Sequence, residues 1–201
     1  MKFKKISLAA ATALAACGAQ AQSSVTIYGS LDQYVNYMTS SSGAKIVALE
    51  DGSNLRSRLG FRGVEDLGGG IQAKFQLEMG LSADTGTMAD SARAFDRQAW
   101  VGFATPYGEF RAGRLNGIVF GRGDYIDFTS RTLGSVVNAF GTPSRYDKTV
   151  AYISPRMAGF LLEAHYSLAE TTAGFSKQSV YQTGVDYLNG PFRVGYAGIT
   201  G

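Results

Sequence analysis

The stretch RLGFRGVEDLGGGIQAKFQLEMGL, residues 58–81, decides the fold class of this chain. In its second half, apolar residues stand at the odd positions and polar residues, with one glycine, at the even positions. The apolar set is Ile71, Ala73, Phe75, Leu77, Met79 and Leu81, and the other set is Gln72, Lys74, Gln76, Glu78 and Gly80. A period of two places these sets on opposite faces of a strand. Three glycines separate this half from an arginine-containing half, so the stretch predicts two strands joined by a tight turn.

Similar alternating segments, separated by turn signals, run through the rest of the chain. About nine strands are predicted, over residues 24–38, 54–63, 71–81, 94–104, 109–114, 149–155, 160–169, 179–188 and 192–201. Arg111 and Arg114 are three residues apart and cannot share one face of a regular strand. We therefore expect a bulge or the end of a strand at that point.

The connections between these segments are alternately short and long. The short ones lie near residues 67–70, 105–108, 155–159 and 189–191, and the long ones near 39–52, 83–93, 115–148 and 170–178. Short turns at one end and long loops at the other are typical of an outer-membrane barrel. The segment near 115–148 is too long to serve only as a link, so we expect it to be functional.

Composition and charge favour a β-rich fold and exclude some partners. The chain has 26 Gly, 12 Phe and 11 Tyr against 4 Pro, a balance that favours strands over helices. Its formal charge of +3 is accounted for by Lys2, Lys4 and Lys5, since the remaining 16 basic residues equal the 16 acidic ones. A neutral remainder without a Gly-rich phosphate loop argues against nucleic-acid binding.

Residues 1–21 have the pattern of a secretory signal peptide. A positively charged start is followed by an apolar run too short to span a bilayer, and then by Ala19-Gln20-Ala21. We expect cleavage after Ala21, with Gln22 as the first residue of the mature chain. The alternative is a lipoprotein signal, because Leu14-Ala15-Ala16-Cys17 resembles a bacterial lipobox that would place a lipid on Cys17.

Two all-β architectures use alternating strands, and the sequence favours the membrane barrel over the soluble β-sandwich. A sheet crosses lipid only as a closed barrel, with an apolar face toward the lipid and a polar face toward a water-filled lumen. The export signal and the alternating loop lengths agree with this. Tyrosines near the strand ends are placed like an aromatic girdle: Tyr28, Tyr34, Tyr37, Tyr107, Tyr181, Tyr187 and Tyr196.

The same segments resemble the general porins of Gram-negative bacteria, of the β-proteobacterial and neisserial type. The matching pieces are SSVTIYGSLD, SRLGFRGVEDLGGGIQAKFQLEMG, FDRQAWVGF, YGEFRAGR and TVAYISPRMAGFLLEAHYS. The resemblance implies a 16-stranded antiparallel transmembrane β-barrel that forms a homotrimer and folds its third long loop inward. Nine strands cover about the N-terminal half of such a barrel, and the chain ends in AGITG where the family ends on an aromatic residue. We therefore expect residues 22–201 to be an incomplete barrel domain.

Basic side chains are the candidate lining of the pore, which works by its width and by its fixed charges. A lipid-facing arginine costs about 2–4 kcal/mol at mid-membrane, so arginines of the strands are expected to face the lumen. The candidates are Arg56, Arg58, Arg62, Lys74, Arg97, Arg111 and Arg145. Arg145 also resembles the arginine that many porins place opposite the inserted loop. The alternative is that some of them lie in solvated turns or pair with Glu65, Glu78 or Asp96.

The inserted loop is expected to supply Asp124 and Asp127 on the opposite side of the pore. With few carboxylates facing several arginines, we expect weak anion selectivity. Trp100 is expected to face lipid or a subunit contact. The one histidine, His165, has no nearby His or Cys and does not suggest a metal site, and no G-x-S-x-G nucleophile elbow is present.

The sequence therefore predicts an outer-membrane porin, without cofactor, metal or enzymatic activity, for passive diffusion of small hydrophilic solutes and ions. One alternative is a non-conducting outer-membrane or lipid-anchored protein that binds a partner at the cell surface. A second alternative, a barrel enzyme, is disfavoured by the missing Ser/His/Asp arrangement.

Overall fold

The computed structural model describes residues 24–129, 135–170 and 179–201. The predicted signal peptide 1–21, the cleavage point between Ala21 and Gln22, and Cys17 lie outside the described residues. Within the described ranges, no helix combines the length and the apolar character needed to cross a membrane.

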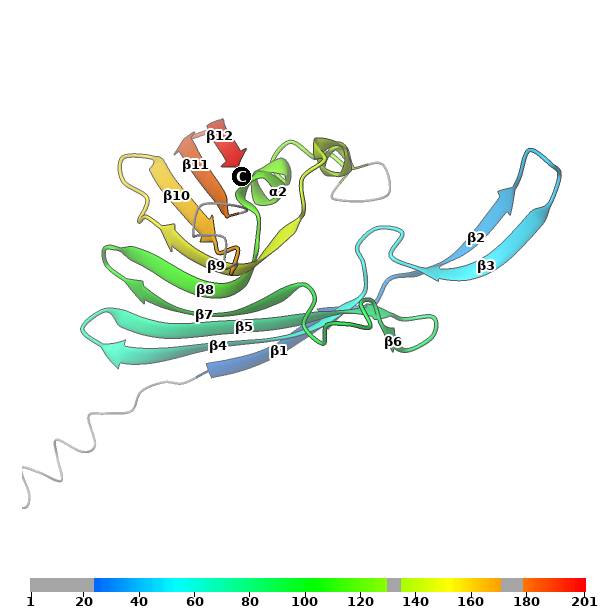
Figure 1. The fold of residues 1–201 in the computed structure, drawn as a ribbon, viewed down its shortest axis with the longest axis horizontal. Helices are drawn as coiled ribbons and strands as arrows, with labels where there is room; N and C mark the ends of the chain where they lie inside the picture. The colour runs from blue at the N-terminus through cyan, green and yellow to red at the C-terminus, as the bar shows by residue number, and fades with distance from the viewer. Residues whose placement is uncertain (1–23, 130–134, 171–178) are drawn as a thin grey trace, which may run out of the picture.

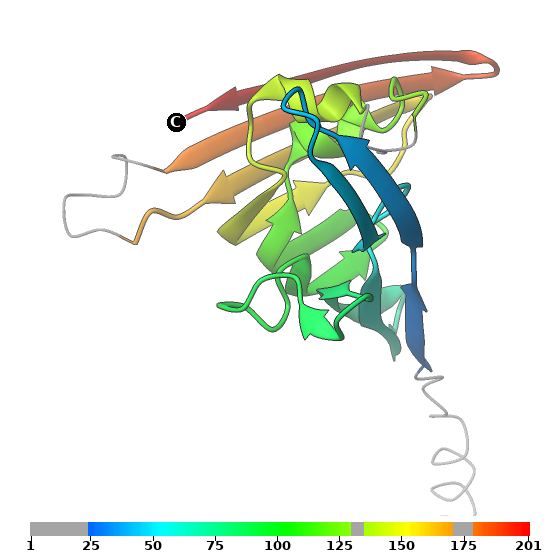
Figure 2. The same ribbon diagram turned by 90° about the vertical axis from the view of Figure 1, so that its right-hand side faces the viewer.

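The main structure is one antiparallel sheet of nine strands, counted over the described residues, with one short strand attached to it. The nine strands pair in the order β1-β4-β5-β7-β8-β9-β10-β11-β12, so each strand lies beside its neighbour in the chain once a separate β2/β3 ribbon is set aside. The sheet curves around the segment α2, and β1 and β12 form its two edges (Figures 1 and 2). The bounds are β1 (Ser24–Ser30), β4 (Arg58–Gly68), β5 (Ile71–Ser82), β7 (Gln98–Thr105), β8 (Gly108–Asn116), β9 (Arg145–Ile153), β10 (Phe160–Ser167), β11 (Val180–Asn189) and β12 (Phe192–Thr200).

The predicted first strand, 24–38, is interrupted after Ser30. Asp32 turns the chain, because its carboxylate accepts the backbone N–H groups of Asn54 and Leu55 at 2.6 and 2.7 Å. Beyond this turn, β2 (Gln33–Thr39) and β3 (Lys45–Asp51) form a two-stranded ribbon that projects from the sheet (Figure 1). Much of the predicted long loop 39–52 is therefore strand. The loop near 83–93 also contains the short strand β6 (Thr87–Met88), which pairs with β5.

Alternation divides the nine-stranded sheet into an outer face and a concave face, as predicted. Residues opposite each other on antiparallel strands point to the same side. Phe75 is opposite Gly63 and Val101, and Val101 is 56% exposed on the outer face. Gln76 is opposite Arg62 and Trp100 on the concave face. The outer face is thus apolar and unburied, which is the arrangement that lipid requires.

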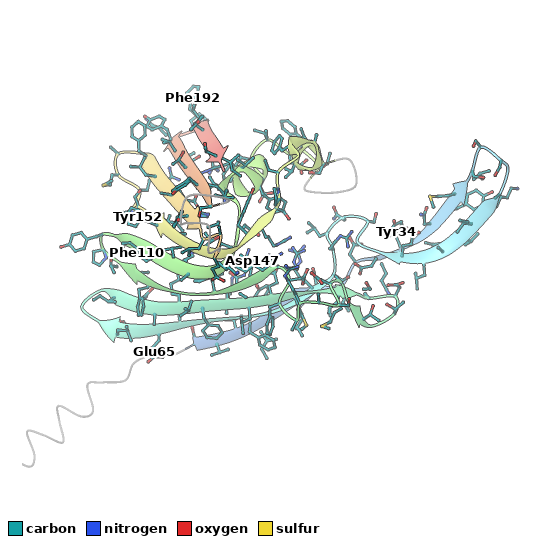
Figure 3. The ribbon with its side chains drawn as sticks, in the orientation of Figure 1. Tyr34, Glu65, Phe110, Asp147, Tyr152 and Phe192 are labelled. Carbon is teal, nitrogen blue, oxygen red and sulfur yellow. The ribbon has the colours of Figure 1, made fainter. Side chains whose placement is uncertain are left out.

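Aromatic side chains gather on the outer face of β8–β12 near the end with the short turns. The rings of Phe110 and Tyr152 are 4.9 Å apart and those of Phe160 and Tyr187 are 4.6 Å apart. Figure 3 shows Phe110 and Tyr152 at this end. The girdle prediction is wrong for Tyr28, whose hydroxyl donates to Glu78 on the concave face at 2.7 Å. It is also wrong for Tyr34 and Tyr37, which lie on the ribbon.

The bulge that the sequence predicts near Arg111 and Arg114 is present in β8. The strand register shifts between Gly113 and Leu115, which is how β8 accommodates both Arg111 and Arg114.

The chain between β8 and β9 runs from residue 117 to 144. Its described part contains α2 (Ile118–Gly123) and the 3-10 helix η1 (Val136–Phe140), and α2 packs against β11 and β12 on the concave side of the sheet (Figure 1).

Candidate functional site

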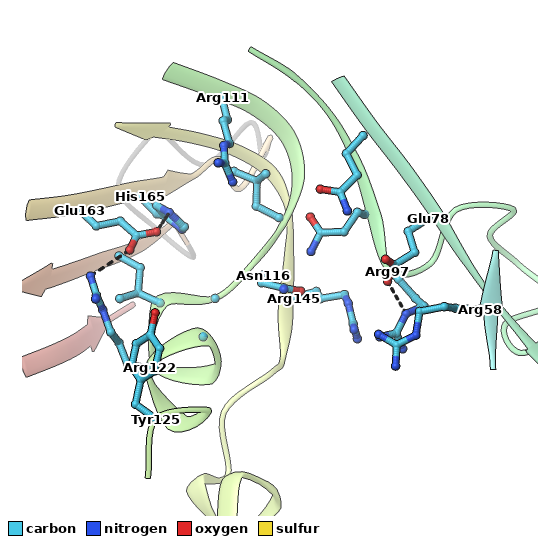
Figure 4. Close-up of a pocket in the computed structure, with 16 residues that line it drawn as sticks. Arg58, Glu78, Arg97, Arg111, Asn116, Arg122, Tyr125, Arg145, Glu163 and His165 are labelled. Carbon is cyan, nitrogen blue, oxygen red and sulfur yellow. Dashed lines mark hydrogen bonds and ion pairs between the residues drawn. The ribbon is translucent and has the colours of Figure 1, made fainter. Parts of the chain in front are cut away.

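A cavity of about 320 Å³ lies between α2 and the concave face of the sheet (Figure 4). Its wall is contributed by strands β4, β5 and β7–β10, and its other side by α2 and the residues around it. The lining residues include five arginines and two glutamates among those described. These are Arg58, Arg97, Arg111, Arg122, Arg145, Glu78 and Glu163.

The structure brings together four of the seven predicted basic residues: Arg58, Arg97, Arg111 and Arg145. Two more, Arg62 and Lys74, lie on the concave face but not in the lining of this cavity. The prediction that Arg56 lies in the same strand as Arg58 and Arg62, within residues 54–63, is wrong. β4 begins at Arg58, and Arg56 lies exposed in the segment before it.

Arg97 and Glu78 form a buried ion pair, with Arg97 Nε donating to Glu78 Oε1 at 2.6 Å. Glu78 also accepts the hydroxyl of Tyr28, which in turn accepts a hydrogen bond from Gln76 Nε2 at 2.6 Å. This network joins β1, β5 and the start of β7. The alternative prediction, that some of the basic residues pair with an acid, is therefore correct for Arg97.

Arg111 is held by an acid and an aromatic ring. Its Nε donates to Glu109 Oε1 at 2.6 Å, and its guanidinium carbon lies 4.4 Å from the centre of the Trp100 ring. Lys74 contacts the same glutamate at 2.9 Å. The prediction that Trp100 faces lipid or a subunit is wrong, since the indole is 7% exposed on the concave face. Gly113, opposite Trp100, lets β8 lie close to β7, because a Cβ there would collide with the backbone of Ala99 and Trp100.

Arg145 stands in the middle of the cavity, next to Asn116 (Figure 4). Its Nη1 donates to Ser144 Oγ at 3.2 Å, and its guanidinium lies over the ring of Phe120. No carboxylate among the described residues forms an ion pair with it. Its charge is therefore less compensated than that of Arg97 or Arg111.

The two loop acids take different positions from those predicted. Asp127 is buried inside the loop and accepts hydrogen bonds from Thr129 Oγ1 at 2.7 Å and Ser135 Oγ at 2.6 Å. Asp124 lies exposed directly after α2. Neither belongs to the cavity lining. The carboxylates that do line it, Glu78 and Glu163, come from the wall strands.

Glu163 was not singled out from the sequence as a site residue. Its Oε2 accepts from Arg122 at 3.2 Å, and its Oε1 is 3.0 Å from His165 Nε2. The odd positions 163 and 165 of β10 alternate with the apolar residues 160, 162 and 164, so strand parity could have identified both. The position of Arg122 could not have been found in this way, because it depends on how the loop folds inward.

At the end with the long loops, the acids and bases pair above the cavity. Arg114 Nη1 contacts Asp147 at 2.5 Å, and Arg93 contacts both Asp147 and Asp90. The backbone N–H of Ala92 and the guanidinium of Arg93 hold the pKa of the Asp90 carboxyl below its ordinary value. These pairs connect the loop after β5 to the end of β8 and the start of β9.

Comparisons with known proteins agree with this geometry. A solved structure of an anion-selective porin from Comamonas acidovorans superposes with a TM-score of 0.72 and 28% identity, over 88% of this chain and 57% of that one. The major outer membrane protein P.IB of Neisseria meningitidis serogroup B is 35% identical over 96% of this chain and 58% of its own length. An outer membrane porin protein of Bordetella pertussis is 34% identical over the same shares.

The chain thus spans less than two thirds of the length of these relatives. The family model described as Gram-negative porin matches residues 7–201, nearly all of the chain. The chain therefore belongs to the Gram-negative porin family.

Proposed function

We propose that the protein forms a water-filled channel in the Gram-negative outer membrane, for passive diffusion of small hydrophilic solutes and ions. The observation that carries this proposal is the two-sided curved sheet. Its outer face is apolar and exposed, and its concave face is charged and partly covered by an inward-folded loop. The names of the relatives, which are outer membrane proteins, support the location. Because the chain spans only 58% of those relatives, the activity of the whole protein is inferred.

Weak anion selectivity is part of the proposal. Five arginines line the described cavity against two glutamates, and both glutamates are paired with arginines. Fixed positive charge at a narrow point concentrates anions and repels cations. The Comamonas acidovorans porin is described as anion-selective. Reversal potentials across a planar bilayer in a salt gradient test this, and a cation-selective channel would refute it.

We further propose a homotrimer whose subunits meet on the outer face of β1 and β4. Exposed aliphatic residues cover these strands, among them Val25, Ile27 and Leu67, whereas aromatic residues mark the ends of β8–β12. A tyrosine and phenylalanine belt is the usual boundary with lipid headgroups, so its interruption supports a protein contact there. Cross-linking in outer-membrane preparations tests this. A product no larger than a monomer would contradict it.

A channel, rather than an enzyme, is the activity that the site supports, since three of its arginines, Arg97, Arg111 and Arg122, are each held by a carboxylate along an open wall. The remaining alternative is a non-conducting surface protein that binds a partner. Swelling of liposomes in isotonic sugar separates the two, because only a channel admits the sugar. The mass of the mature N-terminus tests the anchor, since a chain beginning at Gln22 carries no lipid on Cys17.

A further inference from the structure

Three alternate residues of β11 face the inserted loop: Gln182, Gly184 and Asp186. They share the concave face, because Gln182 is opposite His165 and Gly184 is opposite Glu163. The loop segment α2 packs against this strand and against β12. Each of the three residues makes a different kind of contact with α2.

Gln182 supplies the cap that the loop itself lacks. The first backbone N–H groups of a helix have no partner within the helix. Gly117, the residue before α2, has no side chain to provide one. The N–H of Ile118 donates instead to Gln182 Oε1 at 2.8 Å. Gln182 is 1% exposed, so this contact is shielded from competing water.

Gly184 fixes how closely the loop approaches the wall. A Cβ at this position would lie 2.7 Å from Cγ2 of Ile118, well inside van der Waals contact. Ile118 is itself 2% exposed, and its branched side chain has little freedom to move aside. The loop thus rests directly on the backbone of β11.

Asp186 is bound by arginines from three parts of the chain. Arg122 of α2 approaches it at 3.4 Å, Arg156 of the turn between β9 and β10 at 2.8 Å, and Arg193 of β12 at 2.9 Å. Arg122 also contacts Glu163 at 3.2 Å. Arg122 thus contacts two wall carboxylates, Glu163 and Asp186, which makes it an anchor for the loop.

We propose that Gln182, Gly184 and Asp186 form a docking track that sets the distance of the inserted loop from the wall, and so sets the size limit of the pore. They are positioning residues, while charge selectivity belongs to the arginines across the cavity. This inference rests on the proposed channel function.

The first experiment compares two glycines of the concave face by substituting alanine. Gly184→Ala is expected to push α2 toward the arginines, lowering single-channel conductance and slowing liposome swelling in larger sugars more than in small ones. Gly195→Ala is the matched control, because a Cβ there makes only ordinary contacts, the nearest at 3.4 Å. The reversal potential should change in neither variant.

Adding Ile118→Ala to Gly184→Ala removes the clashing atom and should restore conductance. If Gly184→Ala conducts and sieves as the parent does, the docking track is wrong.

The second experiment locates the loop without relying on conduction. In a Cys17→Ser background, Ile118→Cys with Gly184→Cys should form a disulfide in folded protein. The pair Ile118→Cys with Arg62→Cys is the control and should not cross-link, since Arg62 lies outside the cavity lining. Failure of the first pair to cross-link in a conducting protein overturns the docking track. A parent protein that does not conduct refutes the channel instead.

Discussion

At the scale of single residues, neighbouring side chains decide which of the basic residues can act as free charges. Arg97 and Arg111 each donate to a glutamate at 2.6 Å, and Arg122 lies between Glu163 and Asp186. Arg145 has an aromatic ring and a serine hydroxyl as its partners. An ion pair has little net charge beyond its immediate surroundings, so Arg145 should dominate the field in the cavity.

Neutralising Arg145 should therefore reduce anion selectivity more than any other single change in the wall. With Arg145→Met, we expect the reversal potential in a salt gradient to move toward zero or to change sign. The control is Lys45→Met, which removes the same charge from the exposed ribbon. An equal shift in both variants would mean that net charge, and not the cavity, determines selectivity.

Removing the charge of Glu78 should destabilise the sheet. In Glu78→Gln, the buried Arg97 loses its ion-pair partner, while the hydrogen bond from Tyr28 can be kept. Hydrogen bonds to charged groups contribute about 1.5–3 kcal/mol, so the free energy of unfolding should fall by about 2 kcal/mol. The urea dependence of tryptophan fluorescence measures this loss. Asp84→Asn, at an exposed position in the loop after β5, is the control and should change stability little.

The sequence predicted which face a strand residue takes, but not what that residue binds. Strand parity places Lys74 and Gln76 on the concave face, because alternation is local to the strand. The burial of Asp127 depends on Ser135, eight residues further on. A hydrogen bond within an irregular loop leaves no periodic pattern in the sequence. The sequence therefore could not show that Asp127 is buried inside the loop and does not line the cavity.

At the scale of secondary-structure elements, the ribbon β2/β3 is separable from the wall. Its strands pair with each other in a two-stranded sheet of their own. It was predicted as the end of one strand followed by a loop, because its apolar residues continue the alternation of β1. The interruption of the predicted strand after Ser30 depends on Asp32, whose carboxylate accepts the backbone N–H of Asn54, 22 residues away. A contact over this distance in sequence cannot be predicted from the alternation of apolar and polar residues.

Shortening the ribbon should leave the channel intact. Replacing residues 37–47 with a short Gly-Ser turn removes no strand of the nine-stranded sheet. We expect unchanged insertion into membranes and unchanged single-channel conductance, since exposed loop segments tolerate deletion when no buried backbone is lost. Loss of the folded form in gels of unheated samples would show that the ribbon contributes to assembly.

At the scale of the whole molecule, the division into two faces determines where charge is tolerated. Val101 lies mid-strand on the outer face, and Gln76 lies on the concave face. In lipid, Val101→Arg should lower the free energy of unfolding by about 2–4 kcal/mol. Gln76→Arg should lower it less, because the concave face tolerates charge and the main loss is the hydrogen bond to Tyr28, about 0.5–1.5 kcal/mol. Equal losses, measured by urea titration in lipid vesicles, would contradict the lipid-facing assignment.

The overall architecture was the most predictable level. Nine wall strands, short turns at one end and the bulge near Gly113 all follow from patterns of fewer than about 15 residues. The exact course of the loop between β8 and β9 was not predictable, because Gly184 and Ile118 meet across 66 positions of sequence. Contacts of this kind depend on how the curved sheet surrounds the loop and not on local composition.

The tip of the ribbon has a practical consequence for work on intact cells. The turn is closed by its own hydrogen bonds, with Ser40 N–H donating to the carbonyl of Ala44 at 2.9 Å, and Gly43 has open space around it. A short epitope placed between Ser41 and Ser42 should be displayed outside the bacterium, where an antibody would stain unpermeabilised cells. The same insertion would report the orientation of the chain in its native envelope.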